Sequence, residues 1–225
     1  MMDTVMVGKL GEVAISASSL ANQFYQIFQL LCMGLSAAGL VLAPQYWGAG
    51  EKNTVKRVCD LIMQLVILIG TAFAIVTVLF PEGIMRIYTP DEDVIREGAK
   101  YLRVTALIFL PHGISLVMSN IVRAIGNAKL GLVISIISFI VNIGANYIFI
   151  FGKFGAPAMG VMGAAVGTLI ARTVELIVCV VYMLKFEKEL KYRGKGILKP
   201  PTKGTLTEFS RLGLPAVISD TILGA

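Results

Sequence analysis

Five long apolar stretches constrain this chain more than any other feature of its sequence. They cover residues 14–46, 58–80, 101–122, 130–151 and 161–184. A helix needs about 20 residues to cross the hydrocarbon core of a bilayer, so each stretch is long enough to span a membrane, although Pro111 and Gly113 interrupt the third. The composition agrees, because 56% of the residues are hydrophobic and only 15% are charged. We therefore expect a polytopic membrane protein.

The spanning segments are predicted to be helices packed into a bundle, which makes the expected fold class all-α. A segment inside a bilayer must satisfy its own backbone hydrogen bonds, and the sequence lacks the ten-residue alternation of a membrane β-barrel. Residues 1–13 are too short for a further crossing, and a new apolar segment that opens at Leu212 reaches only Ala225. The expectation is that the chain begins inside one helix and ends inside another, as the inner portion of something longer.

The distribution of Lys and Arg predicts the orientation of the bundle. Thirteen of these residues lie in loops 48–58, 121–130 and 185–211, against six in the segments on the opposite side. The richer side is expected to be cytoplasmic. The basic run at 185–211 could also be read as a nucleic-acid patch, but it lies between two spans, so we expect no nucleic-acid partner.

The loop between the second and third stretches carries helix signals of its own. Pro81 ends the second stretch, and Pro90 with Asp91 forms a turn. Asp91 is predicted to cap a helix that runs through Val94 and continues into the third stretch.

Residues that could support enzyme chemistry are few. The chain has one histidine, His112, and three cysteines, Cys32, Cys59 and Cys179, without metal-ligand spacing. His112 fits either a proton relay or an interfacial position, and the cysteines fit packing roles. The sequence predicts no enzyme, no disulfide framework and no cofactor.

Two asparagines stand out inside the fourth stretch. Asn142 and Asn146 lie four residues apart, so both project from one face of a helix, where amides need partners from a neighbouring helix or a wet cavity. The next stretch opens with "GVMGAAVGT", whose small residues permit close helix approach and whose Thr168 adds a hydroxyl. Interhelical packing and a functional site both remain open as readings of this pair.

Other polar residues inside spans receive narrower interpretations. Arg172 and Glu175, three apart, are predicted to pair along their helix. Gln23 and Gln26 are expected to share an inward face, and together with Tyr25 they are candidates for lining a cleft.

Four segments carry a resemblance to a known family. They are "DTVMVGKLGEVAISA" at 3–17, "AGLVLAPQYWGAGEKNTVKR" at 38–57, "RAIGNAK" at 123–129 and "VNIGANYIFIFGKFGAPAMGVMGAAVGT" at 141–168. In this order and spacing they resemble the amino-terminal lobe of the MATE family of multidrug and toxic compound extrusion transporters.

The resemblance implies one six-helix lobe of a two-lobe (6+6) transporter, truncated at both ends. Residues 1–184 would form the amino-terminal lobe, 185–211 a basic cytoplasmic linker, and 212–225 the start of the seventh helix. Such proteins are multi-pass proteins of the plasma membrane that contact lipid and exchange Na+ or H+ for an organic, often cationic, small molecule. A second transmembrane lobe is the implied partner.

The resemblance also implies a cation-coupling site. Asp3 would match the carboxylate on the first helix, Asn142 and Asn146 the polar pair on the fifth, and Thr168 the hydroxyl on the sixth. Oxygen ligands of these kinds suit a hard cation such as Na+, and a buried carboxylate can hold a proton. Some members carry Asp where this chain has Asn146, which leaves the choice between Na+ and H+ open.

Two alternatives to a drug exporter follow from the same residues. One is a lipid-linked oligosaccharide flippase of the wider superfamily, which the few arginines within the spans disfavour. The other is a truncated fragment that does not transport, motivated by the two ends.

Overall fold

The computed structural model describes residues 11–127, 129–187, 189–194 and 196–198, together with positions 200, 204, 207 and 209. Asp3 and the predicted start of a further helix at 212–225 lie outside the described residues. So do Lys188, Lys195, Lys199, Lys203 and Arg211 of the basic run. Within the described ranges the chain is helical and contains no strand.

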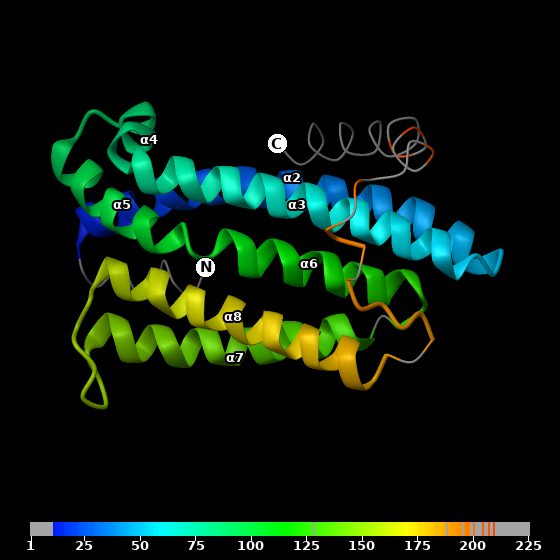
Figure 1. The fold of residues 1–225 in the computed structure, drawn as a ribbon. Coiled ribbons are helices and arrows are strands. Elements are labelled where there is room, and N and C mark those ends of the chain that lie inside the picture. Colours follow the sequence, from blue (N-terminus) through cyan, green and yellow to red (C-terminus); the bar gives the residue numbers. More distant parts are fainter. Residues whose placement is uncertain are drawn as a thin grey trace. The chain divides into compact units, whose positions relative to one another are not determined.

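The helices follow one another with short connections (Figure 1). Their bounds are α2 Glu12–Gly48, α3 Lys52–Leu79, α4 Pro81–Tyr88, α5 Glu92–Thr105, α6 Phe109–Ala124, α7 Lys129–Phe151 and α8 Val161–Lys185.

The predicted spans are confirmed. Among the described residues, helices α2, α3, α7 and α8 are each long and apolar enough to cross a membrane, and α5 and α6 pass the same test together as a pair bent by 51°, which makes up to five spans. Apolar side chains also remain exposed along these helices, for example Leu132, Phe139 and Ile140 of α7. A bilayer can cover such a surface, because lipid tails are as apolar as a protein core.

The interruption of the third apolar stretch lies earlier than the sequence indicated. The helix breaks at residues 106–108, where Leu107 N–H donates to Val104 O and Ile108 N–H to Thr105 O, at 3.1 and 2.8 Å. Pro111 is in the first turn of α6 and causes no break, because the first turn of a helix has no intrahelical partner for the N–H that proline lacks.

The loop after α3 contains more helix than expected. Pro81 occupies the first turn of α4, a short helix that the sequence analysis did not predict. The predicted cap of α5 is confirmed: the Asp91 carboxylate accepts from the backbone N–H groups of Asp93 and Val94, at 3.0 and 3.3 Å.

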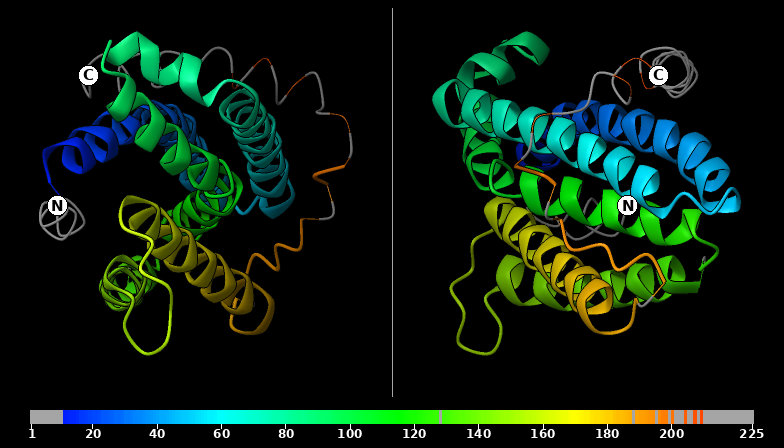
Figure 2. Two further views of the ribbon diagram at one scale, coloured as in Figure 1. Left: turned by 90° about the vertical axis from the view of Figure 1, so that its left-hand side faces the viewer. Right: turned by 45° about the vertical axis from the view of Figure 1, so that its right-hand side comes forward.

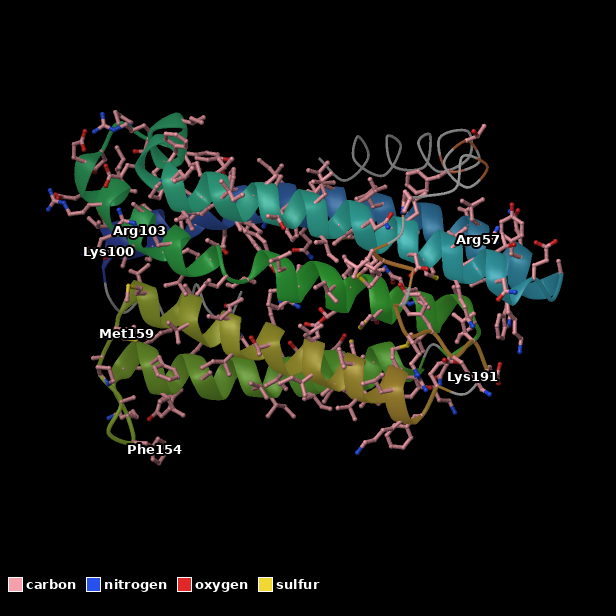
Figure 3. The ribbon with its side chains drawn as sticks, viewed as in Figure 1. Arg57, Lys100, Arg103, Phe154, Met159 and Lys191 are labelled. Atoms are coloured by element: carbon pink, nitrogen blue, oxygen red, sulfur yellow. The ribbon has the colours of Figure 1, made fainter. Side chains whose placement is uncertain are left out.

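The described helices divide between two compact units. Of the described residues, unit 1 comprises 11–28, Gly70–Pro111 and Ile136–Glu175, and unit 2 comprises Gln29–Ile69, His112–Ser135 and those that follow Glu175. The described parts of the connections predicted to be cytoplasmic, at 48–58, 121–130 and 185–211, belong to unit 2, whereas α4 and the α7–α8 loop belong to unit 1. Phe154 projects from that α7–α8 loop (Figure 3) and is 90% exposed.

Unit 1 has an apolar core with small residues at its contacts. Ala14, Ala17 and Ala21 of α2 pack in one cluster with Leu102 of α5 and Ala165 of α8. A second set of contacts joins aromatic rings whose centroids lie 4.8–6.4 Å apart, namely Phe24, Phe28, Phe73 and Phe109.

In unit 2 the segment after α8 is docked on α3 (Figure 2). The Tyr192 hydroxyl donates to the Asp60 carboxylate at 2.8 Å, and the Gln64 side chain donates to Ile197 O at 2.7 Å. Gly196 permits this approach, because a Cβ at that position would overlap the Asp60 carboxylate. The first part of the predicted linker is therefore packed against the bundle.

Candidate functional site

Helix α8 approaches α7 closely in unit 1 because glycines face the contact. A Cβ on Gly163 would overlap the carbonyl group of Phe149, and one on Gly167 would overlap the side-chain oxygen of Asn146 and lie 2.9 Å from the Asn146 backbone nitrogen. The prediction that the small residues of this segment allow close approach is confirmed.

Three of the predicted site residues meet at this contact, and we call them the α7–α8 polar cluster: Asn142, Asn146 and Thr168. The Asn146 side-chain NH2 donates to the side-chain amide oxygen of Asn142 at 3.2 Å, and the Asn142 side-chain NH2 donates to the Thr168 hydroxyl at 3.4 Å. Thr168 in turn donates to Ala164 O at 3.1 Å. Asn146 has no exposed surface, whereas the other two are half-buried.

The chemistry of the cluster is that of neutral oxygen and NH2 groups. Two amide oxygens and one hydroxyl oxygen are ligand types that hard cations prefer. Among the described residues, no group of three or more His, Cys, Asp or Glu side chains could hold a metal ion. The carboxylate that the resemblance implies, Asp3, lies outside the described residues, so its place in the site stays a prediction.

A charge pair lies one turn further along α8. Arg172 Nη1 and Glu175 Oε2 are 2.7 Å apart, which confirms the predicted pair. The Ser138 hydroxyl of α7 donates to the same carboxylate oxygen at 3.4 Å. Ser138 was missed in the sequence, although it stands four residues before Asn142 on the same helix face.

The glutamines of α2 lie on its exposed surface in this lobe. Gln23 and Gln26 are both exposed, and the prediction that they share an inward face stays a prediction. Tyr25 is buried, and its ring centroid lies 6.2 Å from that of Phe109. The lining of a cleft by these three residues stays a prediction.

The remaining reactive side chains are dispersed. His112 is buried in α6, and its role stays open. Cys32, Cys59 and Cys179 are all buried thiols, which agrees with the packing interpretation.

A family model describes most of this chain. The model MatE matches residues 1–148. The chain belongs to the MatE family. Two curated relatives named "Probable multidrug resistance protein NorM" align over almost the whole chain. The one from Agrobacterium fabrum is 32% identical over 222 residues, covering 98% of this chain and 47% of the relative. The one from Thermotoga maritima is 30% identical over 223 residues, covering 99% and 47%.

Solved MATE structures share the fold. An inward-facing and an outward-facing multidrug resistance MATE family transporter of the MOP superfamily match with TM-scores of 0.85 and 0.83, each at 21% identity. These matches cover 97% of this chain and 49% and 48% of the solved chains. The chain spans about half the length of the relatives that it matches, and it has the helical fold of one lobe of a MATE transporter.

Proposed function

We propose that this chain is the amino-terminal lobe of a secondary transporter that exports organic, often cationic, compounds in exchange for Na+ or H+. The family supports an efflux role, because several relatives are named as multidrug resistance proteins. Alternating access of a cleft between two lobes would move the compound. The proposal assigns the chain a transport role and no enzymatic one.

The observation that carries the proposal is the α7–α8 polar cluster. Asn146 is fully buried in a helix whose other faces are apolar, where an amide is costly unless it is hydrogen-bonded. Its side-chain NH2 donates to Asn142, which in turn donates to Thr168, so oxygen atoms from two helices come together. In the proposal, Asp3 adds a carboxylate to these oxygens, and the set binds the coupling cation.

The whole transporter would be larger than this chain. We propose that a second transmembrane lobe completes the cleft, that residues 185–211 form a cytoplasmic linker between the lobes, and that the seventh helix begins at 212. The protein would reside in the plasma membrane, in contact with its lipids, with loops 48–58, 121–130 and 185–211 facing the cytoplasm. The Lys and Arg distribution supports this orientation.

The test is efflux of a fluorescent organic cation from cells that express the full reading frame containing this chain. Asn142→Leu removes an amide that bonds both other members of the cluster, so we expect efflux to fall by at least about tenfold. Asn127→Leu is a matched control, because Asn127 bonds the Tyr182 hydroxyl in unit 2, away from the cluster.

Surface expression and monodispersity in detergent must be similar for parent and variants. Efflux by Asn142→Leu at the parental rate contradicts the site. No efflux by the parent, with transfer of a lipid-linked sugar instead, would favour the flippase.

A further inference from the structure

The polar cluster is part of a longer row of polar side chains between α7 and α8. On α7, Ser138 precedes Asn142 and Asn146 at spacings of four, and on α8, Thr168 is followed by Arg172 and Glu175 at spacings of four and three. These spacings place each set on one helix face. Hydrogen bonds join the two helices at both ends of the row, between Asn142 and Thr168 and between Ser138 and Glu175.

The charged end of this row is largely buried. The side chains of Arg172 and Glu175 are 27% and 10% exposed. Single charges at such depth are costly, and removal of one member of a buried pair leaves an uncompensated charge. The main effect of Glu175 is therefore to neutralise the charge of Arg172.

Arg172 is close to the proposed cation site along the helix. Residues four apart on a helix have Cβ atoms about 5–6 Å apart, so Arg172 is attached to α8 one turn from Thr168. An uncompensated guanidinium at that range would repel a cation strongly in a poorly solvated setting. The Glu175 carboxylate, 2.7 Å from the guanidinium, cancels most of that repulsion.

We propose that Arg172 and Glu175 set the electrostatic potential at the α7–α8 polar cluster, with Glu175 acting as a positioning and neutralising residue that allows a monovalent cation to bind one helical turn away. Glu175 is not a ligand in this account. The inference rests on the proposed cation coupling and adds two residues that control its affinity.

The test is the cation dependence of organic-cation transport by the full-length protein in liposomes, driven by a Na+ gradient or a pH gradient, whichever drives the parent. Glu175→Gln leaves Arg172 without its partner charge, so the half-saturating cation concentration should rise at least about tenfold. Arg172→Gln leaves the carboxylate without its partner charge, so this concentration should fall below the parental value.

The double variant with Arg172→Gln and Glu175→Gln distinguishes charge from packing. It removes both charges and keeps hydrogen-bonding groups, so its half-saturating concentration should return close to the parental value. If Glu175→Gln does not fold, the comparison of Arg172→Gln with the double variant still isolates the carboxylate: the single variant should bind the cation more tightly.

Folded Glu175→Gln with parental cation dependence would overturn the inference, as would a double variant that is as impaired as Glu175→Gln. Asn142→Leu separates this inference from the proposed function. Loss of cation dependence in Asn142→Leu with no change in the charge variants leaves the cation site standing and rejects the role of Glu175. Parental behaviour of Asn142→Leu rejects the cation site itself.

Discussion

Asn146 combines a packing contact with its proposed role in the cation site. Its amide is fully buried and bonds Asn142, while Gly167 leaves it room on the opposing helix. The sequence left two interpretations of Asn142 and Asn146 open, interhelical packing and a functional site. The contacts in the structure are compatible with both interpretations. A substitution that tightens the contact therefore tests packing at the site directly.

Gly167→Ala should destabilise the protein. The added methyl group would overlap the Asn146 side chain, and overpacking of this kind costs about 1–3 kcal/mol. We expect a lower melting temperature in detergent and weaker transport. Gly144→Ala is the matched control on α7, because a Cβ there meets no atom within 4 Å. Equal melting temperatures for the two variants would contradict this packing.

Tyr192 should ionise only at unusually high pH. Burial, reinforced by the Asp60 carboxylate that its hydroxyl contacts, raises the pKa of Tyr192. Because the pKa of Tyr192 is higher in the folded than in the unfolded state, the contribution of the protonated Tyr192 to folding stability is complete below the unfolded-state pKa of about 10. It is lost as the pH rises from there through the folded-state pKa. Tyrosinate absorbance at alkaline pH, compared with that of Tyr192→Phe, should show Tyr192 titrating after the exposed tyrosines. Titration with the exposed group would mean that the linker is not docked.

At the scale of elements, the cap of α5 is the clearest local determinant of structure. Asp91→Ala removes a carboxylate that accepts two backbone N–H groups, so the free energy of unfolding should fall by about 1 kcal/mol. Asp93→Ala is the control, because its contact with Arg96 is long, at 3.8 Å, and exposed. Thermal unfolding of both variants checks this, and an equal loss would show that the cap is not special.

The sequence predicted the spans better than the breaks between them. Long apolar stretches define helices almost unaided in a membrane protein, because lipid and core select the same residues. The break at 106–108 left no signal, since Ala106, Leu107 and Ile108 are ordinary residues of an apolar helix. The short helix α4 was missed because Pro81 was interpreted only as the end of the second stretch, although proline is also common in the first turn of a helix.

The site was predictable for a different reason. Spacing alone placed Asn142 and Asn146 on one face, and the family resemblance added Thr168. Ser138 became evident only through its bond to Glu175.

At the scale of the whole molecule, the orientation can be tested with introduced cysteines. The native cysteines are buried and should not react with a membrane-impermeant maleimide. Phe154 and Leu198 are 90% and 96% exposed, on the α7–α8 loop and on the linker. Phe154→Cys should react in intact cells, and Leu198→Cys only after permeabilisation. The opposite pattern would invert the proposed topology.

The central claim is that a cation bound at the α7–α8 polar cluster drives export. The most direct test is transport of an organic cation into liposomes by the purified full-length protein, with an imposed Na+ or proton gradient. The account predicts that one of these gradients drives transport by the parent, and that Asn142→Leu, folded and inserted equally well, loses the response. Transport that ignores both gradients, or a response that survives in Asn142→Leu, would contradict it.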